Sequence, residues 1–345
     1  MTEIAIAILN WNGLEYLKKF LPSVIKYSLS ETVNIYIIDN GSTDDSIEFI
    51  RSNFNNIQII ELDKNYGFAG GYNKGLSQIK ADYYFLLNSD VEVTENWIDP
   101  LHELLKNNKE IAACQPKILS YSDKNKFEYA GAAGGYIDKF GYPFCQGRIF
   151  NVNETDNNQY NEIKAIFWSS GACMLIRADL FQITGGFDDE FFAHMEEIDL
   201  CWRLKNMDYK IAYVPESQVY HLGGGTLPKS NPRKTFLNFR NNYFLLFKNL
   251  TLINFLKTYI IRIFFDFGSF ILFLSELKIK DATAILKAHF IFWISIKVLN
   301  KKKKSFSNKI KIRNHKEIYS KSIVMDFYIR SIRSFNELHF NTDTL

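Results

Sequence analysis

Short apolar runs alternate with segments of helical periodicity over the first hundred residues. The runs are rich in branched and aromatic side chains, which predicts buried strands at residues 4–9, 33–38, 57–62 and 83–87. Between them, apolar side chains return every three or four residues, which predicts helices at residues 14–27, 44–52 and 68–79. Strands separated by helices in this way indicate βαβ units, a mainly parallel sheet and an α/β fold.

The pattern becomes less regular after the fourth strand. Thr94 is expected to cap a helix that continues to Leu105. Residues 120–160 are rich in Gly, Tyr and Asn, which predicts long loops and short strands, and long loops on a rigid scaffold often carry specificity. Further strands are expected at residues 168–176 and 210–214, and a helix over residues 199–204.

Two strongly apolar segments, residues 252–274 and 290–299, follow a change of composition near residue 228. Arg262 and Asp266 interrupt the first segment, and a spanning helix needs about 20 apolar residues, so a transmembrane helix is not favoured. Two interpretations stay open: helices lying on a membrane, or helices packed on protein. The two charges are four residues apart, so they would either pair on one face or mark a face in contact with water.

Composition sets the broad class of the protein. The chain has 345 residues, of which 47% are hydrophobic and 23% charged, as in ordinary globular proteins. We expect a catalytic domain over residues 1–228 and a helical C-terminal region over residues 229–345. A net charge of +3 argues against a partner such as nucleic acid. The N-terminus enters an apolar strand without a basic segment, which does not fit a signal peptide.

The cysteines and a lysine run indicate the compartment and one candidate surface. None of the four cysteines has metal-site spacing, which predicts reduced, buried thiols in a cytoplasmic protein. They are Cys114, Cys145, Cys173 and Cys201. The lysines at residues 301–304 favour a solvated segment, with a patch for anionic lipid headgroups as the alternative.

Polar side chains follow three of the predicted strands. The segments are Asn10-Trp11-Asn12-Gly13, Asp39-Asn40-Gly41-Ser42 and Asn88-Ser89-Asp90. Each one alone is typical of a turn. Because the carboxyl ends of parallel strands meet at one sheet edge, where ligands bind, three such segments predict a binding site there.

These residue types suit a nucleoside diphosphate. Asp90 is the candidate ligand of a divalent cation, which would neutralise phosphate oxygens. Trp11 offers a face on which a base could stack, and Asp39 offers acceptors for a base or ribose. The glycine-rich segment 65–75 predicts close backbone approach and free amides at a helix start. It does not match the Gly-x-Gly-x-x-Gly pattern, which weakens a dehydrogenase interpretation.

An acidic cluster and one histidine supply candidates for proton transfer and metal binding. Glu196, Glu197 and Asp199 lie within four residues. Asp199 would pair with Arg203 four residues later, which leaves one glutamate as a candidate general base. His221, placed in a glycine-rich loop after a strand, is either structural or a metal ligand.

Taken together, these segments resemble family 2 glycosyltransferases, in the bacterial rhamnosyltransferase-like branch. The resemblance spans residues 4 to about 225 in the order of the family. It is carried by residues 8–13, 38–44, 65–73, 86–91, 170–174, 185–188, 196–203 and 221–225.

The resemblance implies the glycosyltransferase A-type fold, a single Rossmann-like nucleotide-binding domain with a mixed, mainly parallel sheet. It implies an inverting reaction with a divalent cation, Mg²⁺ or Mn²⁺, bound by Asp90 and His221. Glu197 would be the base, with Glu196 as the alternative. The nucleotide sugar would contact Asn10, Trp11, Asp39, Asn40, Gly67, Phe68, Asn73, Asn88 and Ser89. The metal segment begins with Asn88 where the family often has an acid, and the base is Glu where the family often has Asp.

The expected reaction is a single displacement in which the acceptor oxygen attacks the anomeric carbon. The donor would be dTDP-rhamnose or a UDP-sugar, and the acceptor a glycan or lipid-linked molecule of cell-surface polysaccharide assembly. Alternatives are a retaining enzyme, a processive synthase, or a catalytically inactive sugar- or nucleotide-binding subunit. The expected place is the cytoplasm, with a peripheral position on the inner face of the plasma membrane as the membrane alternative.

Overall fold

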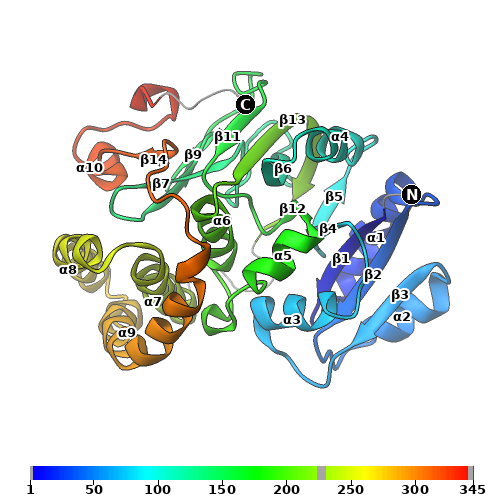
Figure 1. The fold of residues 1–345 in the computed structure, drawn as a ribbon, viewed down its shortest axis with the longest axis horizontal. Helices are drawn as coiled ribbons and strands as arrows, with labels where there is room; N and C mark the ends of the chain where they lie inside the picture. Colours follow the sequence, from blue (N-terminus) through cyan, green and yellow to red (C-terminus); the bar gives the residue numbers. More distant parts are fainter. Residues whose placement is uncertain (1–2, 224–230, 341–344) are drawn as a thin grey trace.

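A nine-stranded sheet forms the centre of the protein in the computed structural model, which describes residues 3–223, 231–340 and 345 (Figure 1). Its strand order is β11-β13-β6-β12-β4-β1-β2-β3, and β5 pairs with β13. The strands are β1 (Ile4–Asn10), β2 (Val33–Asp39), β3 (Ile57–Glu61), β4 (Tyr83–Asn88), β5 (Val91–Val93), β6 (Ile111–Ser120), β11 (Lys164–Ile166), β12 (Cys173–Arg177) and β13 (Lys210–His221).

The βαβ half of the molecule follows the sequence pattern. Strands β1 to β4 are parallel, and the helices between them are α1 (Leu14–Ser28), α2 (Ser46–Asn53) and α3 (Gly67–Leu76). Alternate residues of β1 enter opposite cores, with Ile6 and Ile8 on one face and Ala5 and Ala7 on the other. A strand buried on both faces accounts for its continuous apolar run. The predicted α/β fold with a mainly parallel sheet is confirmed.

The expected cap at Thr94 is wrong. Helix α4 (Asp99–Asn107) begins five residues later, with Pro100 in its first turn, where proline is well tolerated. Thr94 instead donates from Oγ1 to the Gln218 carbonyl oxygen at 2.7 Å. Its side chain therefore ties the segment after β5 to β13.

A second, five-stranded sheet occupies the region expected to hold loops and short strands. Its order is β10-β9-β8-β7-β14. The strands are β7 (Gly135–Asp138), β8 (Pro143–Cys145), β9 (Arg148–Ile149), β10 (Val152–Asn153) and β14 (Ile318–Tyr319). Because β14 comes from the C-terminal region, that region is joined to this sheet by backbone pairing.

The strand predicted at residues 168–176 starts later, at Cys173. The residues before it form a buried turn, in which the Ser170 amide donates to Gln115 Oε1 at 2.8 Å. The Ala172 carbonyl accepts from the Asn88 amide at 3.0 Å. This turn therefore lies beside the end of β4. All four cysteines are free and buried, as expected.

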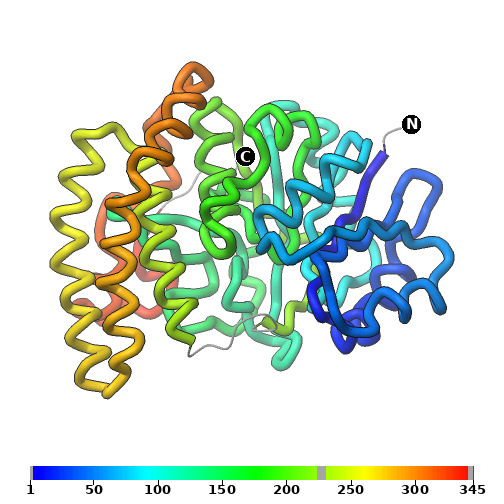
Figure 2. The backbone as a smooth tube through the Cα atoms, turned by 90° about the horizontal axis from the view of Figure 1, so that it is seen from below, coloured from blue at the N-terminus to red at the C-terminus, as the bar shows by residue number. Residues whose placement is uncertain are grey.

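Three long helices form a layer at one end of the molecule (Figure 2). They are α7 (Pro232–Asn249), α8 (Leu252–Ser275) and α9 (Ile279–Phe306), and the short α10 (Ile323–Tyr328) follows. Helix α7 packs on α6 (Glu196–Asn206), while α8 is the outermost of the three in both views. By length and composition alone, α8 and α9 could each cross a membrane, and 22% and 33% of their most apolar windows are buried.

Two of the charges within α8, Arg262 and Asp266, do not face water, whereas Lys257 is exposed. Arg262 and Asp266 are buried, and 3.5 Å separates Arg262 Nε from Asp266 Oδ1. The expectation that the two charges pair on one face is confirmed, and the expectation that they mark a solvent-exposed face is wrong. The lysines at residues 301–304 continue α9, where Lys302 pairs with Asp188 and Lys303 donates to the Phe247 carbonyl. The boundary expected at residues 228 and 229 and the motif glycines Gly224 and Gly225 involve residues outside those described.

Candidate functional site

The sheet register places the polar strand ends side by side. Asn10 pairs with Asp39 of β2, and Leu9 pairs with Asn88 of β4. The three predicted segments therefore meet at one edge of the parallel half. The Asn88 and Ser89 side chains are partly exposed at this edge.

Asn10 and Asp39 form the buried floor of this edge. Asn10 Nδ2 donates to Asp39 Oδ1 at 3.0 Å and to Ser46 Oγ at 2.9 Å, while its Oδ1 has no hydrogen-bond partner among the described residues. Asp39 Oδ2 accepts from the Ser42 amide at 3.0 Å. Trp11, directly after the floor, leaves 47% of its surface exposed. The edge therefore combines fixed polar groups with an accessible aromatic face.

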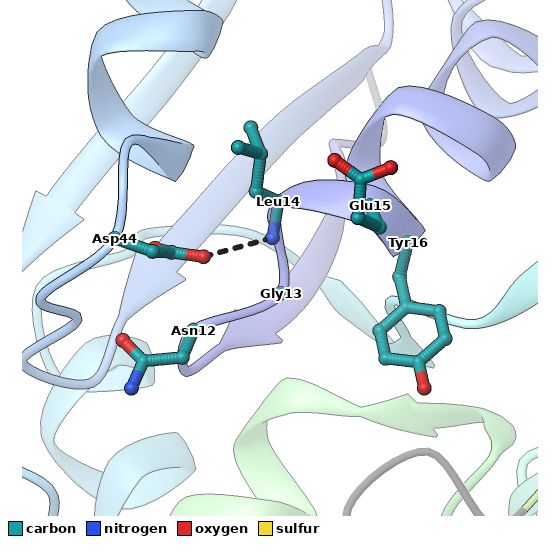
Figure 3. Close-up of a pocket in the computed structure, with 6 residues that line it drawn as sticks. All are labelled: Asn12, Gly13, Leu14, Glu15, Tyr16 and Asp44. Atoms are coloured by element: carbon teal, nitrogen blue, oxygen red, sulfur yellow. Dashed lines mark hydrogen bonds between the residues drawn. The ribbon is translucent and has the colours of Figure 1, made fainter.

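A hollow of about 460 Å³ opens beside this floor at the start of α1 (Figure 3). Its lining is Asn12, Gly13, Leu14, Glu15, Tyr16 and Asp44. Asp44 Oδ2 accepts from the Leu14 amide at 3.0 Å. Although burial opposes ionisation, hydrogen bonds from Ser46 and Leu14 lower the pKa of Asp44. With Asp44 and Glu15 in its wall, the hollow is unsuited to a diphosphate, because like charges repel.

The start of α3 is occupied within the protein, so the expectation of free amides there is wrong. The Phe68 and Ala69 amides donate to the Phe192 carbonyl at 2.8 and 3.3 Å. A side chain at Gly67, whose φ is +74°, would lie 2.6 Å from the Phe192 ring. Asn40 Oδ1 accepts from the Tyr66 amide at 2.9 Å, which fixes the same turn.

Asn73 also acts within the protein. Its Nδ2 donates to the Phe187 carbonyl at 2.8 Å, and its Oδ1 accepts from the Phe187 amide at 2.9 Å. Gly67, Phe68 and Asn73 thus join α3 to the segment that leads into α6, while Asn40 fixes the turn before α3.

Asp90 and His221 meet through strand pairing. Val91 of β5 lies opposite His221 of β13, so Asp90 is adjacent to the imidazole, with Oδ1 3.1 Å from Nε2. His221 is the last residue of β13, and its expected position in a loop is wrong. Its other nitrogen, Nδ1, lies 3.2 Å from Glu128 Oε2. Burial opposes a charged imidazole, but Asp90 and Glu128 on either side raise the pKa of His221 to about 10.

This arrangement fits a divalent cation. Two donors that bind an octahedral cation in adjacent positions at about 2.1 Å lie about 3.0 Å apart, close to the observed Asp90–His221 spacing. Glu128 would orient the histidine ring, as outer carboxylates do at metal sites. The imidazole would have to release its proton to bind the cation. Among the described residues, no group of three or more His, Cys, Asp or Glu side chains has metal-ligating geometry. A cation here would therefore depend on ligand oxygens and water.

Helix α6 begins with the two glutamates, and their environments favour the neutral acid. Burial, followed by the Glu197 charge, raises the pKa of Glu196 well above its ordinary value. Burial raises the pKa of Glu197 to about 7. One carboxylate oxygen of each glutamate has no hydrogen-bond partner among the described residues. Asp199, in contrast, lies 2.8 Å from both Arg203 and Lys248, as expected for a structural pair.

Glu197 lies beside the sheet edge. A side chain at Gly171, in the turn that bonds to Asn88, would lie 3.2 Å from Phe68, closer than an ordinary contact, and 3.9 Å from Cβ of Glu197. The backbone at Glu197 therefore lies close to the turn beside the end of β4. The Glu197 carboxylate, with a pKa near neutrality, can accept a proton from a hydroxyl.

A strained segment precedes the glutamates. Phe192, His194 and Met195 have positive φ values of 65°, 70° and 74°. Residues other than glycine adopt this region at a cost of about 1–3 kcal/mol each and keep it only where the surroundings enforce it. Here Asn241 of α7 enforces it, because its Nδ2 faces three carbonyls, at 2.9 Å from Phe191, 2.8 Å from Ala193 and 2.7 Å from His194.

Three residues of this site were missed by the sequence analysis. Glu128 lies in the region without motifs, and it reaches His221 only when β6 and β13 pair in the folded chain. Asn241 lies beyond the segments that resemble the family. His194, whose pKa burial lowers to about 4, has no partner for Nε2 among the described residues, although its place beside the glutamates was a signal.

Comparisons with known proteins identify the family of the chain. The family model described as glycosyl transferase family 2 matches residues 5–183. The chain is 25% identical over 240 residues to the N-acetylglucosaminyl-diphospho-decaprenol L-rhamnosyltransferase of Mycobacterium tuberculosis, covering 64% of this chain and 76% of the relative. It is 22% identical over 253 residues to a low-salt glycan biosynthesis hexosyltransferase of Haloferax volcanii, covering 70% and 75%.

Two of the solved structures that share the fold illustrate the likeness. GalNAc-T7 with UDP, GalNAc and Mn²⁺ has a TM-score of 0.55 at 17% identity, covering 71% of this chain and 48%, about half, of that one. A mannosyltransferase from Pyrobaculum calidifontis with GDP-Man and Mn²⁺ has a TM-score of 0.53 at 10% identity, covering 89% and 83%. At these identities the likeness shows the fold alone, and it confirms the A-type glycosyltransferase fold.

Proposed function

We propose that this chain moves one sugar from a nucleoside-diphosphate donor to a lipid-linked acceptor. The chain belongs to glycosyl transferase family 2, in its rhamnosyltransferase-like branch. It is a glycosyltransferase of polysaccharide or glycan biosynthesis. The proposed donor is dTDP-rhamnose or a UDP-sugar. The rhamnosyltransferase named above supports both the sugar and the lipid carrier. The proposed place is the cytoplasm, with residues 1–228 as the catalytic domain and residues 229–345 as the C-terminal region.

The donor is proposed to lie across the edge formed by β2, β1 and β4. The exposed Trp11 would stack on the base, while Asn10 and Asp39 would bind the base or ribose through acceptor oxygens. The Asn88 and Ser89 side chains at the end of β4 would face the diphosphate. Asn40, Gly67, Phe68 and Asn73 contribute by shaping the walls rather than by direct contact, because their polar groups are used within the protein.

Asp90 and His221 are the proposed ligands of Mg²⁺ or Mn²⁺. When bound, the cation would neutralise the charge that develops on the leaving diphosphate. The support is the 3.1 Å spacing of the two donor atoms and the carboxylate of Glu128 behind the ring. Both solved structures named above contain Mn²⁺ with a nucleotide or nucleotide sugar.

The observation that carries the proposal is the Glu197 side chain, whose Oε2 has no hydrogen-bond partner among the described residues and whose Cβ lies near the turn beside the end of β4. In a single inverting displacement, the acceptor oxygen forms a bond to the anomeric carbon as the bond to the diphosphate oxygen breaks. The acceptor proton passes to Glu197, and the nucleoside diphosphate leaves. A pKa near 7 lets the carboxyl take up the proton and release it again at neutral pH.

Donor hydrolysis tests this proposal without knowledge of the acceptor. The chain is incubated with a panel of UDP-, dTDP- and GDP-sugars and Mg²⁺ or Mn²⁺, and nucleoside diphosphate release is measured. We expect slow release from dTDP-rhamnose or a UDP-sugar, its loss in excess chelator, and its loss in Asp90→Ala. Binding of a donor without release, with or without acceptor extracts, would support the inactive-subunit alternative.

A further inference from the structure

Helix α8 buries the charged pair Arg262 and Asp266, while most of its large apolar side chains are exposed. Its buried positions include Thr258, Arg262 and Asp266. The large side chains that face outward are Leu252, Ile253, Leu256, Ile260, Ile261, Ile263, Phe264, Phe267, Ile271, Leu272 and Leu274. A surface helix in water normally shows the opposite distribution. This order is expected where the outer medium is apolar.

The outward face, defined here by those eleven residues, is too large for an ordinary surface. Each residue leaves between 38% and 71% of its area exposed, so together they present on the order of 1,000 Å² of apolar surface. Monomeric soluble proteins rarely expose contiguous patches larger than a few hundred Å². Helix α9 adds Phe290, Trp293 and Ile294 beside it, all exposed.

The charges around this face identify what covers it. Between residues 252 and 304, all of them described, seven lysines are exposed and Glu276 is the one exposed acid. The lysines are Lys257, Lys278, Lys280, Lys287, Lys297, Lys301 and Lys304. In a symmetric dimer through this face, lysines of both copies would meet at the rim and repel. An anionic lipid bilayer would instead suit both the apolar side chains, which its interior accepts, and the lysines, which its headgroups attract.

The inner side of α8 determines how the helix lies. Arg262 donates from Nη1 to the Phe140 carbonyl at 3.0 Å, and its guanidinium lies 3.9 Å from the centre of the Tyr142 ring. Phe265 packs edge-on against Phe140 at 5.7 Å between ring centres. Because the middle of α8 contacts the turn between β7 and β8, lipid cannot surround the helix there, which favours a helix that lies along the membrane surface over one that spans the bilayer.

We propose that the outward face of α8, with the adjoining side of α9, binds an anionic lipid bilayer in the plane of its surface. The exposed lysines contact headgroups, and the apolar side chains enter the acyl boundary. Arg262 and Asp266 face the protein and hold α8 against the second sheet. The catalytic domain thereby stays on the aqueous side, beside the membrane. This proposal stands on the C-terminal helices and is independent of the donor and of the catalytic residues.

Vesicle flotation of the full chain tests the proposal. Phosphatidylcholine vesicles with and without phosphatidylglycerol are compared, and we expect flotation with the anionic vesicles that weakens in high salt. Replacing three central residues by serine, Ile260→Ser, Phe264→Ser and Phe267→Ser together, should reduce partitioning at least about tenfold. The matched control is Leu29→Ser with Ile183→Ser, two exposed residues elsewhere, which should float like the natural chain.

A labelled cysteine keeps the test valid if the serine variant fails to fold. The four native cysteines are buried, so a thiol introduced as Phe264→Cys can be labelled alone with an environment-sensitive dye. Its emission should shift to the blue with anionic vesicles, while the same dye at Ile183→Cys should not respond. Equal responses at the two positions would overturn the proposal. So would a natural chain that ignores anionic vesicles and sediments as a dimer that the serine variant dissociates.

Discussion

Replacing Glu197 by glutamine separates proton transfer from structure. The free carboxylate oxygen makes no hydrogen bond among the described residues, and the amide has nearly the same shape, so no hydrogen bond at that atom is lost in the variant. Loss of a general base typically slows a reaction by about 10²–10⁴-fold, which is about 3–5 kcal/mol in the barrier. Donor binding should be unchanged, because Glu197 is proposed to face the acceptor.

The raised pKa of Glu197 predicts how stability and turnover depend on pH. Burial raises it to about 7, against about 4.3 in an unfolded chain, so the folded state holds the proton more tightly. Stability should therefore fall as the pH rises from about 4.3 to about 7, by at most about 4 kcal/mol, and the glutamine variant should escape that fall. The natural enzyme should gain turnover between about pH 6 and pH 8, where the folded-state carboxylate forms, whereas the variant should not.

The assay measures turnover at saturating donor, donor KM and melting temperature at pH 6 and pH 8. Glu196→Gln is the matched control, with the same chemical change one residue earlier. If Glu196→Gln is inactive while Glu197→Gln retains turnover, the base is Glu196. If both variants keep full turnover, neither glutamate accepts the proton and the reasoning fails.

Three further variants test the surroundings of the site. Asp90→Asn should lose cation-stimulated turnover by several orders of magnitude and lower the melting temperature without cation, because the buried charged His221 loses one of its two carboxylates; unchanged stimulation by Mn²⁺ would contradict the assigned ligand. Glu128→Gln should raise the cation concentration needed for half-maximal activity about 10–100-fold, because the ring of His221 loses its carboxylate; titration with Mn²⁺ measures this. Asn241→Leu should lower stability by about 1–3 kcal/mol and turnover more than donor KM, and equal turnover with lower stability would limit Asn241 to folding.

The parallel half of the fold could be predicted because its information is local. Each strand from β1 to β4 is a short apolar run, and each connecting helix has its own periodicity. Parallel pairing then places Asn10, Asp39 and Asn88 at one edge without knowledge of other contacts. Four of the eight segments that carry the family resemblance, residues 8–13, 38–44, 65–73 and 86–91, lie in or directly after this half.

The remaining features depend on contacts that only the folded chain makes. Glu128 reaches His221 only after β6 and β13 pair, and residues 120–160 show no periodicity that would predict a sheet. The Phe68 and Ala69 amides of α3 were expected to be free. They are bound by the Phe192 carbonyl, which lies more than a hundred residues later, so the sequence around α3 could not show this contact. Helix α8 is apolar nearly all round in sequence, so its pattern could not show that Arg262 faces inward.

The central claim is that this chain transfers a sugar from a nucleotide donor to a lipid-linked acceptor at the site of Asp90 and Glu197. It is tested most directly by mass spectrometry of a lipid-linked sugar acceptor. The acceptor is incubated with the enzyme, Mg²⁺ or Mn²⁺, and the intact nucleotide sugar that the enzyme hydrolyses in the donor panel. The account predicts a mass gain of one sugar, matched by an equal amount of nucleoside diphosphate and absent in both Asp90→Ala and Glu197→Gln. Nucleoside diphosphate release without any change in the acceptor, or a mass gain that survives both substitutions, would contradict it.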